Sequence, residues 1–252
     1  MRWIRFTAAG RTAYGILEGD QVTEVAGGLF DPPVPTGTRH RLDAVKIEVP
    51  FIPRTFYAAG LNYTAHIKDQ AATVPQQPDM GYRAVNALIA HNEPVLIPSG
   101  ATKVQYEGEL AVVIGCQAKH LTEANALSCV FGYTIGNDVS ERAWQAQDRT
   151  FWRSKNTDTF KPMGPWIETV ARLEDMQTTV RLNGTVQTRF ATNDMLFGVQ
   201  RYIATMTQYL TLYPGDVLWM GTDGVSPDLA PGDVVEVEIA GIGTLRNPFM
   251  AA

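Results

Sequence analysis

The sequence predicts an α+β protein in which β-strands predominate. Three observations indicate this class: runs in which polar and apolar residues alternate, short apolar runs, and turn sequences between them. Helical spacing is plausible for Thr122–Val130, where Thr122 is a favourable N-cap, and for Asn193–Thr205, which opens on Asn193 and Asp194. The chain is therefore expected to be β-rich with few helices.

Two domains are expected, with a boundary near residue 50. Residues 2–25 alternate and are interrupted by turns at Gly10 and Gly19, which predicts a three-stranded meander. Residues 27–41 contain three prolines and three glycines, which predicts a loop or linker. A small N-terminal domain (1–50) is thus followed by a larger domain (51–252). Strands are expected at Trp3–Thr7, Ala13–Leu17, Gln21–Val25, Thr55–Ala59, Leu110–Ile114, Val217–Met220 and Val234–Ile239.

Composition excludes several classes of function. The net charge is −5 and the basic residues are scattered, which does not suit a nucleic-acid-binding face. No apolar run approaches the roughly 18 residues of a membrane span, and the N-terminus lacks a signal peptide's apolar segment. Two cysteines, Cys116 and Cys129, are too few for a disulfide framework. We expect reduced thiols and a cytoplasmic protein.

An acidic pair marks the most informative segment. Glu107 and Glu109 lie two residues apart before an apolar strand, so both side chains point to one face, and Gly108 between them allows close backbone approach. Asp138 follows another strand-like run. Buried carboxylates repel one another unless a cation lies between them, and oxygen ligands suit Mg²⁺, Mn²⁺ or Ca²⁺. The pair alone equally suits a solvated strand edge, although the apolar run that follows argues against it.

A series of short motifs extends over residues 53–248. It runs from Tyr57-Ala58-Ala59-Gly60-Leu61-Asn62-Tyr63 and His66 through Tyr106-Glu107-Gly108-Glu109-Leu110, Gly132-Tyr133-Thr134 and Asn137-Asp138-Val139-Ser140 to Asp158-Thr159-Phe160, Gly164-Pro165-Trp166, Asn183-Gly184 and Gly221-Thr222. Each motif alone is weak. In this order they resemble the fumarylacetoacetate hydrolase superfamily, specifically its short bacterial members.

The resemblance implies an architecture and a metal. The fold would be a mixed β-sandwich roll, preceded in the chain by a small N-terminal α/β domain. The usual assembly would be a homodimer. Mg²⁺ or Mn²⁺ would be bound by Glu107, Glu109 and Asp138. The substrate would be a small 2-oxo acid with a pyruvate-like moiety.

The resemblance also assigns substrate-binding positions. Lys155 matches the active-site lysine, Gln145 the glutamine seven residues after the metal-binding aspartate, and Thr222 the threonine that contacts the substrate carboxylate. Arg142 is a candidate carboxylate ligand, although four residues after Asp138 it more readily forms a structural ion pair.

His66 is the candidate general base. Asp69 follows three residues later, so within one helical turn the two would share a face and the acid could orient the imidazole. The superfamily usually has Glu at this position, one methylene longer. Two other departures are Asp223, where Pro is usual and where a negative charge would disfavour a second substrate carboxylate, and Arg83, which replaces a frequent lysine in the lid-like segment 70–85.

The leading hypothesis is a metal-dependent enzyme that makes or breaks a C–C bond in a 2-oxo acid through a metal-chelated, pyruvate-type enolate. Acylpyruvate hydrolysis and aldol-type cleavage are the first candidates. The alternatives are decarboxylation of a β-keto acid such as oxaloacetate, isomerisation of a 2-hydroxydienoate, and an inactive homologue that only binds ligands. A dinucleotide-binding fold is disfavoured, because no G-x-G-x-x-G follows the first strands.

Overall fold

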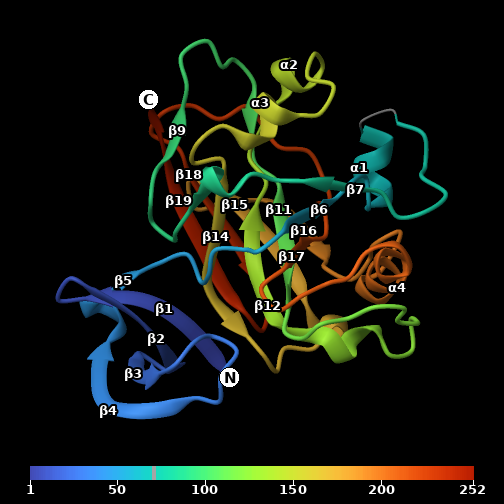
Figure 1. The fold of residues 1–252 in the computed structure, drawn as a ribbon. Helices are drawn as coiled ribbons and strands as arrows, with labels where there is room; N and C mark the ends of the chain where they lie inside the picture. The colour runs from blue at the N-terminus through green and yellow to red at the C-terminus, as the bar shows by residue number, and fades with distance from the viewer. Residues whose placement is uncertain (70–71) are drawn as a thin grey trace.

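The computed structural model describes residues 1–69 and 72–252, whose strands form two main sheets (Figure 1). The larger sheet has twelve strands and runs through both parts of the chain. Its path is β4 (Val34–Arg41), β3 (Gln21–Ala26), β2 (Arg11–Glu18), β1 (Arg2–Ala8), β14 (Lys161–Glu168), β12 (Val130–Asn137), β11 (Gly108–Ile114), β17 (Val217–Trp219), β6 (Phe56–Ala59) and β7 (Met80–Tyr82), with β5 (Lys46–Ile47) on β1 and β8 (Leu88–Ile89) on β14.

A five-stranded sheet packs against the larger one. Its order is β16 (Thr185–Ala191), β15 (Gln177–Leu182), β18 (Val234–Ile239), β19 (Gly243–Ala251) and β9 (Val95–Ile97), while β10 (Val104–Gln105) and β13 (Ser140–Glu141) pair separately. The helices are short: α1 (Thr64–Asp69), α2 (Arg142–Gln145), α3 (Trp152–Asn156) and α4 (Val199–Tyr209). The predicted α+β, β-rich class is confirmed.

The main core lies between the two sheets. Leu110 and Val112 of β11 belong to one buried cluster with Val180 of β15 and Val237 of β18. A Cβ added to Gly108 would lie 2.9 Å from both valines, so glycine is needed where β11 enters this interface. The close packing fixes the end of β11 that carries the acidic pair.

The N-terminal part confirms the predicted meander and corrects the predicted loop. Strands β1, β2 and β3 form as expected, and β1 continues the large sheet by pairing with β14. Residues 34–41, however, form β4, which is exposed on both faces and so lacks an alternating pattern. Pro35 is tolerated there because an edge strand need not donate every N–H to a neighbour.

Both helix predictions need correction. Thr122 closes a turn through hydrogen bonds to the Asn125 side chain, a 3₁₀ turn follows at residues 126–129, and β12 then begins, so no α-helix forms there. The second helix, α4, starts at Val199 rather than Asn193. Leu196 and Phe197 instead donate their backbone N–H groups to Asn62, so the segment before Val199 forms turns and bends rather than helix.

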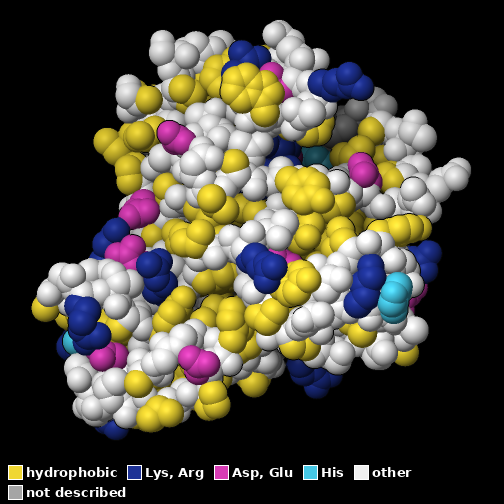
Figure 2. Space-filling view, in the orientation of Figure 1, with side chains coloured by type: hydrophobic (Ala, Val, Ile, Leu, Met, Phe, Trp, Pro, Cys, Tyr) yellow, Lys and Arg dark blue, Asp and Glu magenta, His cyan; other side chains and the backbone are white. Residues whose placement is uncertain are grey.

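The surface carries mixed charge. On the face in Figure 2, Lys and Arg side chains are interspersed with Asp and Glu. Among the described residues, no helix has the length and apolar character needed to cross a membrane.

Candidate metal centre and active site

Three carboxylates meet at one end of two paired strands. β11 and β12 are antiparallel with Glu109 opposite Gly136, so Glu107 before β11 and Asp138 after β12 come together. The backbone N–H of Asp138 donates to the Glu107 carbonyl at 2.8 Å, which fixes this junction. One ligand atom from each of Glu107, Glu109 and Asp138 lies within 4.8 Å of the others, and all three side chains are buried. We call these residues the carboxylate triad.

Glu107 is held by two cations. Its Oε1 accepts from Arg142 at 2.6 Å and its Oε2 from the Lys155 ammonium at 2.6 Å. Burial favours the neutral acid, but these two charges outweigh burial and lower the pKa of Glu107 to about 2. Glu107 is therefore ionised at neutral pH.

Asp138 contacts three cations. Its Oδ2 accepts from Arg83 and Lys155, each at 2.8 Å, and its Oδ1 lies 2.8 Å from the ammonium of Lys161. Burial opposes ionisation, yet these cations hold the pKa of Asp138 well below its usual range. Burial also lowers the pKa of Lys161, to about 7, despite the adjacent Asp138.

Glu109 differs from its two neighbours. Its Oε2 accepts from the backbone N–H of Gly221 at 2.8 Å, and it forms no salt bridge within the described part of the chain. Burial and then the charges of Asp138 and Glu107 raise the pKa of Glu109 to about 8. The site therefore holds two ionised carboxylates and a third, buried one that has no cationic partner among the described residues. Three carboxylates arranged in this way suit a hard divalent cation. The residues therefore fit the metal that the sequence predicts.

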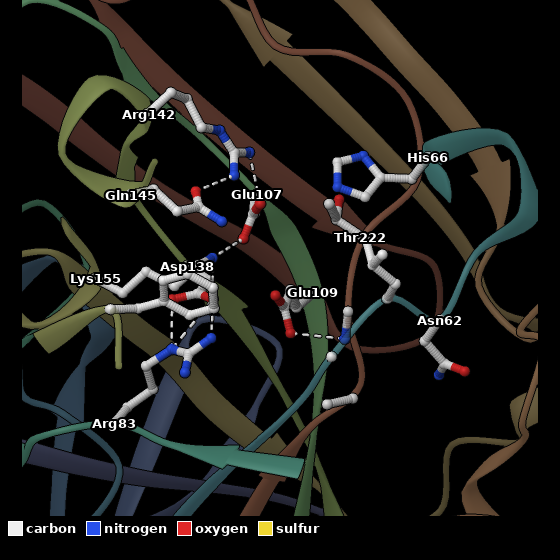
Figure 3. A pocket seen from close by; sticks show the side chains of 15 residues that line it. Asn62, His66, Arg83, Glu107, Glu109, Asp138, Arg142, Gln145, Lys155 and Thr222 are labelled. Carbon is white, nitrogen blue, oxygen red and sulfur yellow. Dashed lines mark hydrogen bonds and ion pairs between the residues drawn. The ribbon is translucent and has the colours of Figure 1, made fainter. Parts of the chain in front are cut away.

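A cavity of about 240 Å³ opens beside the triad (Figure 3). His66 and Thr222 lie on one side of the carboxylates, and Arg142 and Gln145 lie on the other. The structure thus brings the predicted site residues other than Asp69 to one cavity, whose lining includes His66, Arg83, Glu107, Glu109, Asp138, Arg142, Gln145, Phe151, Lys155 and Thr222.

Arg142 uses its guanidinium to arrange its neighbours. Besides contacting Glu107, it donates to Oε1 of Gln145 at 2.8 Å and to Oε1 of Gln105 at 2.9 Å. Because arginine is only a donor, the oxygen of Gln145 must face it. The amide NH₂ of Gln145 is left for the cavity.

His66 lies on α1, which the predicted helical turn anticipated. Its Nδ1 lies 2.9 Å from the Gly224 carbonyl, and its backbone N–H donates to Asp223 Oδ1 at 3.0 Å. The Asp223 carboxylate therefore faces the start of α1, which weakens the sequence-based argument that it repels a second substrate carboxylate. The side chain of Asp69 lies outside the described residues.

Sequence reasoning missed two polar residues at this site. Lys161 is fully buried on β14 beside Asp138, and its ammonium also donates to the carbonyls of Val139 and Phe160. A lysine within the otherwise apolar run from Phe160 to Trp166 was the available signal. Gln105 had no such signal, because only the folded chain places it against Arg142.

The match to a known family decides the classification. Residues 55–250 match the model of the fumarylacetoacetate (FAA) hydrolase C-terminal domain. The chain belongs to the fumarylacetoacetate hydrolase family. Residues 1–50 match a second model, Rv2993c-like, N-terminal. Enzymes of the fumarylacetoacetate hydrolase family typically depend on a divalent metal, in keeping with the carboxylate triad.

Relatives within the fumarylacetoacetate hydrolase family differ in reaction. The chain is 35% identical to 2,4-didehydro-3-deoxy-L-rhamnonate hydrolase of Sphingomonas sp., over 98% of this chain and 95% of the relative. It is 33% identical to human mitochondrial oxaloacetate tautomerase FAHD2A, over 98% and 91%. The crystal structure of 5-carboxymethyl-2-hydroxymuconate delta-isomerase from Mycobacterium smegmatis superposes with a TM-score of 0.93 at 36% identity, over 100% of both chains. These relatives act on small molecules.

Proposed function

We propose that the chain is a divalent-metal-dependent enzyme that makes or breaks a C–C bond in a small 2-oxo acid. The observation that carries this proposal is the carboxylate triad at a cavity that His66 and Lys155 also line. Glu107, Glu109 and Asp138 would hold Mg²⁺ or Mn²⁺. The ion, when bound, would supply a Lewis acid for the 1-carboxylate and 2-oxo oxygens of the substrate.

The size of the cavity favours a small substrate. Its volume of about 240 Å³ lies below the roughly 300–1,000 Å³ of pockets that hold drug-sized ligands. This space suits a pyruvate-like group with a short substituent.

Two side chains are arranged to stabilise negative charge on such a substrate. The Lys155 ammonium has three N–H donors, and the contacts to Glu107 and Asp138 use two of them. The third donor and the amide NH₂ of Gln145 are then available to oxygens of the substrate. Fixed donors of this kind stabilise the charge that develops as a C–C bond breaks.

His66 would act as the general base in acylpyruvate hydrolysis. Its Nε2 takes a proton from water, and the resulting hydroxide adds to the acyl carbonyl carbon. The C–C bond to the adjacent methylene then breaks, and its electron pair passes to the pyruvate enolate, which takes up a proton. The products are a carboxylic acid and pyruvate. In aldol cleavage the same base takes the proton of the 4-hydroxyl group.

Isomerisation or tautomerisation is the second candidate, because the similar isomerase structure and the tautomerase relative each cover nearly the whole chain. Proton transfer between carbon and oxygen needs a base and stabilisation of an enolate, but no water attack. Decarboxylation of oxaloacetate would not need His66 as a base, because no proton is removed from water or from a hydroxyl group.

A panel assay tests the proposal. Metal-stripped protein, with and without Mg²⁺ or Mn²⁺, is incubated with acylpyruvates, 4-hydroxy-2-oxo acids and oxaloacetate, while pyruvate release and enol absorbance are followed. Metal-dependent turnover of at least one substrate is expected, and its absence for all of them would leave a non-catalytic binding protein as the better account. His66→Gln should abolish hydrolysis and aldol cleavage but spare decarboxylation. His120→Asn, which changes a histidine outside the cavity, is the control. A homodimer and a cytoplasmic location stay predictions from the sequence.

A further inference from the structure

The imidazole of His66 is held by a backbone carbonyl. Its Nδ1 lies 2.9 Å from the oxygen of Gly224. A carbonyl oxygen only accepts hydrogen bonds, so Nδ1 must carry the proton, and in the neutral ring Nε2 carries the lone pair. Figure 3 shows the ring turned toward the side of the cavity that holds Glu107 and Thr222. The contact therefore selects the tautomer that a base facing the cavity requires.

The backbone of His66 is held by the residue next to Gly224. His66 is the third residue of α1, so its N–H is one of the first four that lack a partner inside the helix. Asp223 Oδ1 accepts from this N–H at 3.0 Å. Ring and backbone of His66 are thus both attached to residues 223 and 224.

The same turn reaches the metal site and the cavity wall. We call residues 221–224 the Gly221–Gly224 turn. The Gly221 N–H donates to Glu109, and Thr222 lines the cavity. Gly224 has a φ of +80°, and a Cβ there would lie 2.7 Å from Thr188, so this position needs glycine to present its carbonyl to His66. The Gly221–Gly224 turn therefore contacts both His66 and Glu109, and so sets the position of the imidazole relative to the triad.

We propose that Asp223 and the Gly224 carbonyl are positioning elements of His66, which hold its backbone and its ring. Asp223 is a positioning residue, since its described contact is with the His66 backbone. The proposal rests on the proposed function only in taking His66 as the base. The state of the imidazole ring can be measured without turnover.

The first test is nuclear magnetic resonance of protein labelled with ¹⁵N-histidine, metal-free and Mg²⁺-loaded, at a pH where the imidazole is neutral. The chain has four histidines, and His66→Gln assigns the signals of His66. We expect a protonated Nδ1 and an unprotonated Nε2. A His66 ring protonated at Nε2 would overturn the proposal.

The second test uses Asp223→Ala, Asp223→Asn and, as a matched control for charge, Asp20→Ala in the exposed β2–β3 turn. Outer partners of metal-binding side chains typically contribute 10- to 100-fold to activity, and we expect the same range for a partner of the base. Asp223→Ala should therefore lower kcat by about 10- to 100-fold with little change in KM or Mn²⁺ affinity, and should broaden or shift the His66 ring signals. Asp223→Asn keeps an acceptor oxygen and should lose less.

The two tests separate the possible failures. Unchanged kcat and unchanged His66 signals in Asp223→Ala would overturn the positioning role. Full activity of His66→Gln would instead contradict the base role in the proposed function, while the ring signals would still decide whether the Gly221–Gly224 turn positions His66. Thermal unfolding of each variant identifies any general loss of structure. If Asp223→Ala is unfolded, the kcat and the His66 signals of Asp223→Asn are compared with those of the parent instead.

Discussion

Glu109 accepts a 2.8 Å hydrogen bond from the backbone N–H of Gly221, whereas Glu107, two residues earlier, is paired with both Arg142 and Lys155. The two glutamates share a strand end but have opposite electrostatic surroundings. Burial and neighbouring acids raise the pKa of Glu109 to about 8, and the cations lower that of Glu107 to about 2. Within the triad, Glu109 is therefore the carboxylate whose ionised form a bound metal would stabilise most.

Replacing Glu109 should not destabilise the metal-free protein at pH 8. Its pKa rises from 4.5 in an unfolded chain to about 8 in the fold, so the folded state binds more protons and stability falls as pH rises through this window. Glu109→Gln removes this fall and keeps an acceptor for Gly221. Thermal unfolding in chelator should show the variant at least as stable as the parent at pH 8. Glu107→Gln removes the carboxylate partner of Arg142 and one of the two carboxylates that contact Lys155. It should cost about 3–5 kcal/mol, and equal losses in both variants would contradict this assignment.

Metal binding should release a proton near neutral pH. Glu109 must lose its proton to bind a cation, so apparent affinity should rise about tenfold per pH unit up to about pH 8 and then level off. Titration calorimetry at pH 7 in two buffers with different heats of ionisation measures the release. Binding without proton release at pH 7 would show that Glu109 is already ionised in the metal-free protein.

Removing the Lys161 ammonium should tighten metal binding. This group lies 2.8 Å from Asp138 Oδ1, and burial lowers its pKa to about 7, so it is partly charged at neutral pH and repels an incoming cation. Lys161→Met should raise Mn²⁺ affinity more at pH 6.5 than at pH 8.5, where the lysine is mostly neutral. Lys119→Met, on the surface, is the control. Weaker binding by the Lys161 variant would indicate that Lys161 holds Asp138 in place for the metal.

Gly136 should not tolerate a methyl group. A Cβ there would lie 2.7 Å from the fully buried ring of Trp219, which has no room to move. Gly136→Ala should therefore destabilise the protein by about 1–3 kcal/mol in chemical denaturation. It should also weaken Mn²⁺ binding, because Asp138 is two residues away on the same segment. Gly198→Ala meets no such clash, because the nearest atom to the added methyl group would be 3.7 Å away and φ is −67°. It should cost less, at most about 1 kcal/mol, because alanine is a poorer N-cap of α4 than glycine.

Local sequence patterns located seven of the strands and predicted the helices poorly. Alternation and apolar runs located β1–β3, β6, β11, β17 and β18, because each depends on residues within the strand. The exposed strand β4 had no such pattern, and the start of α4 depends on Asn62, far away in the sequence. Contacts between distant segments therefore determine the structure at these two places, where the local pattern does not predict it.

The site shows the same division. The motif order identified the residues that now line one cavity, but not the contacts that set their charge. Residue spacing does not predict three of these contacts: Arg83 with Asp138, Lys161 with Asp138, and His66 with the Gly224 carbonyl. Each contact joins segments that are brought together only by the fold. Such contacts determine which carboxylate is protonated and which imidazole nitrogen faces the cavity.

The central claim is that the carboxylate triad binds a divalent ion that in turn holds a 2-oxo acid. Calorimetric titration of metal-stripped protein with Mn²⁺, with and without oxalate as a mimic of the pyruvate enolate, tests it most directly. We expect one ion per chain, tighter binding in the presence of oxalate, and loss of both effects in Glu109→Gln. Absence of Mn²⁺ binding, or a Glu109→Gln variant that binds Mn²⁺ and oxalate as the parent does, would contradict the claim.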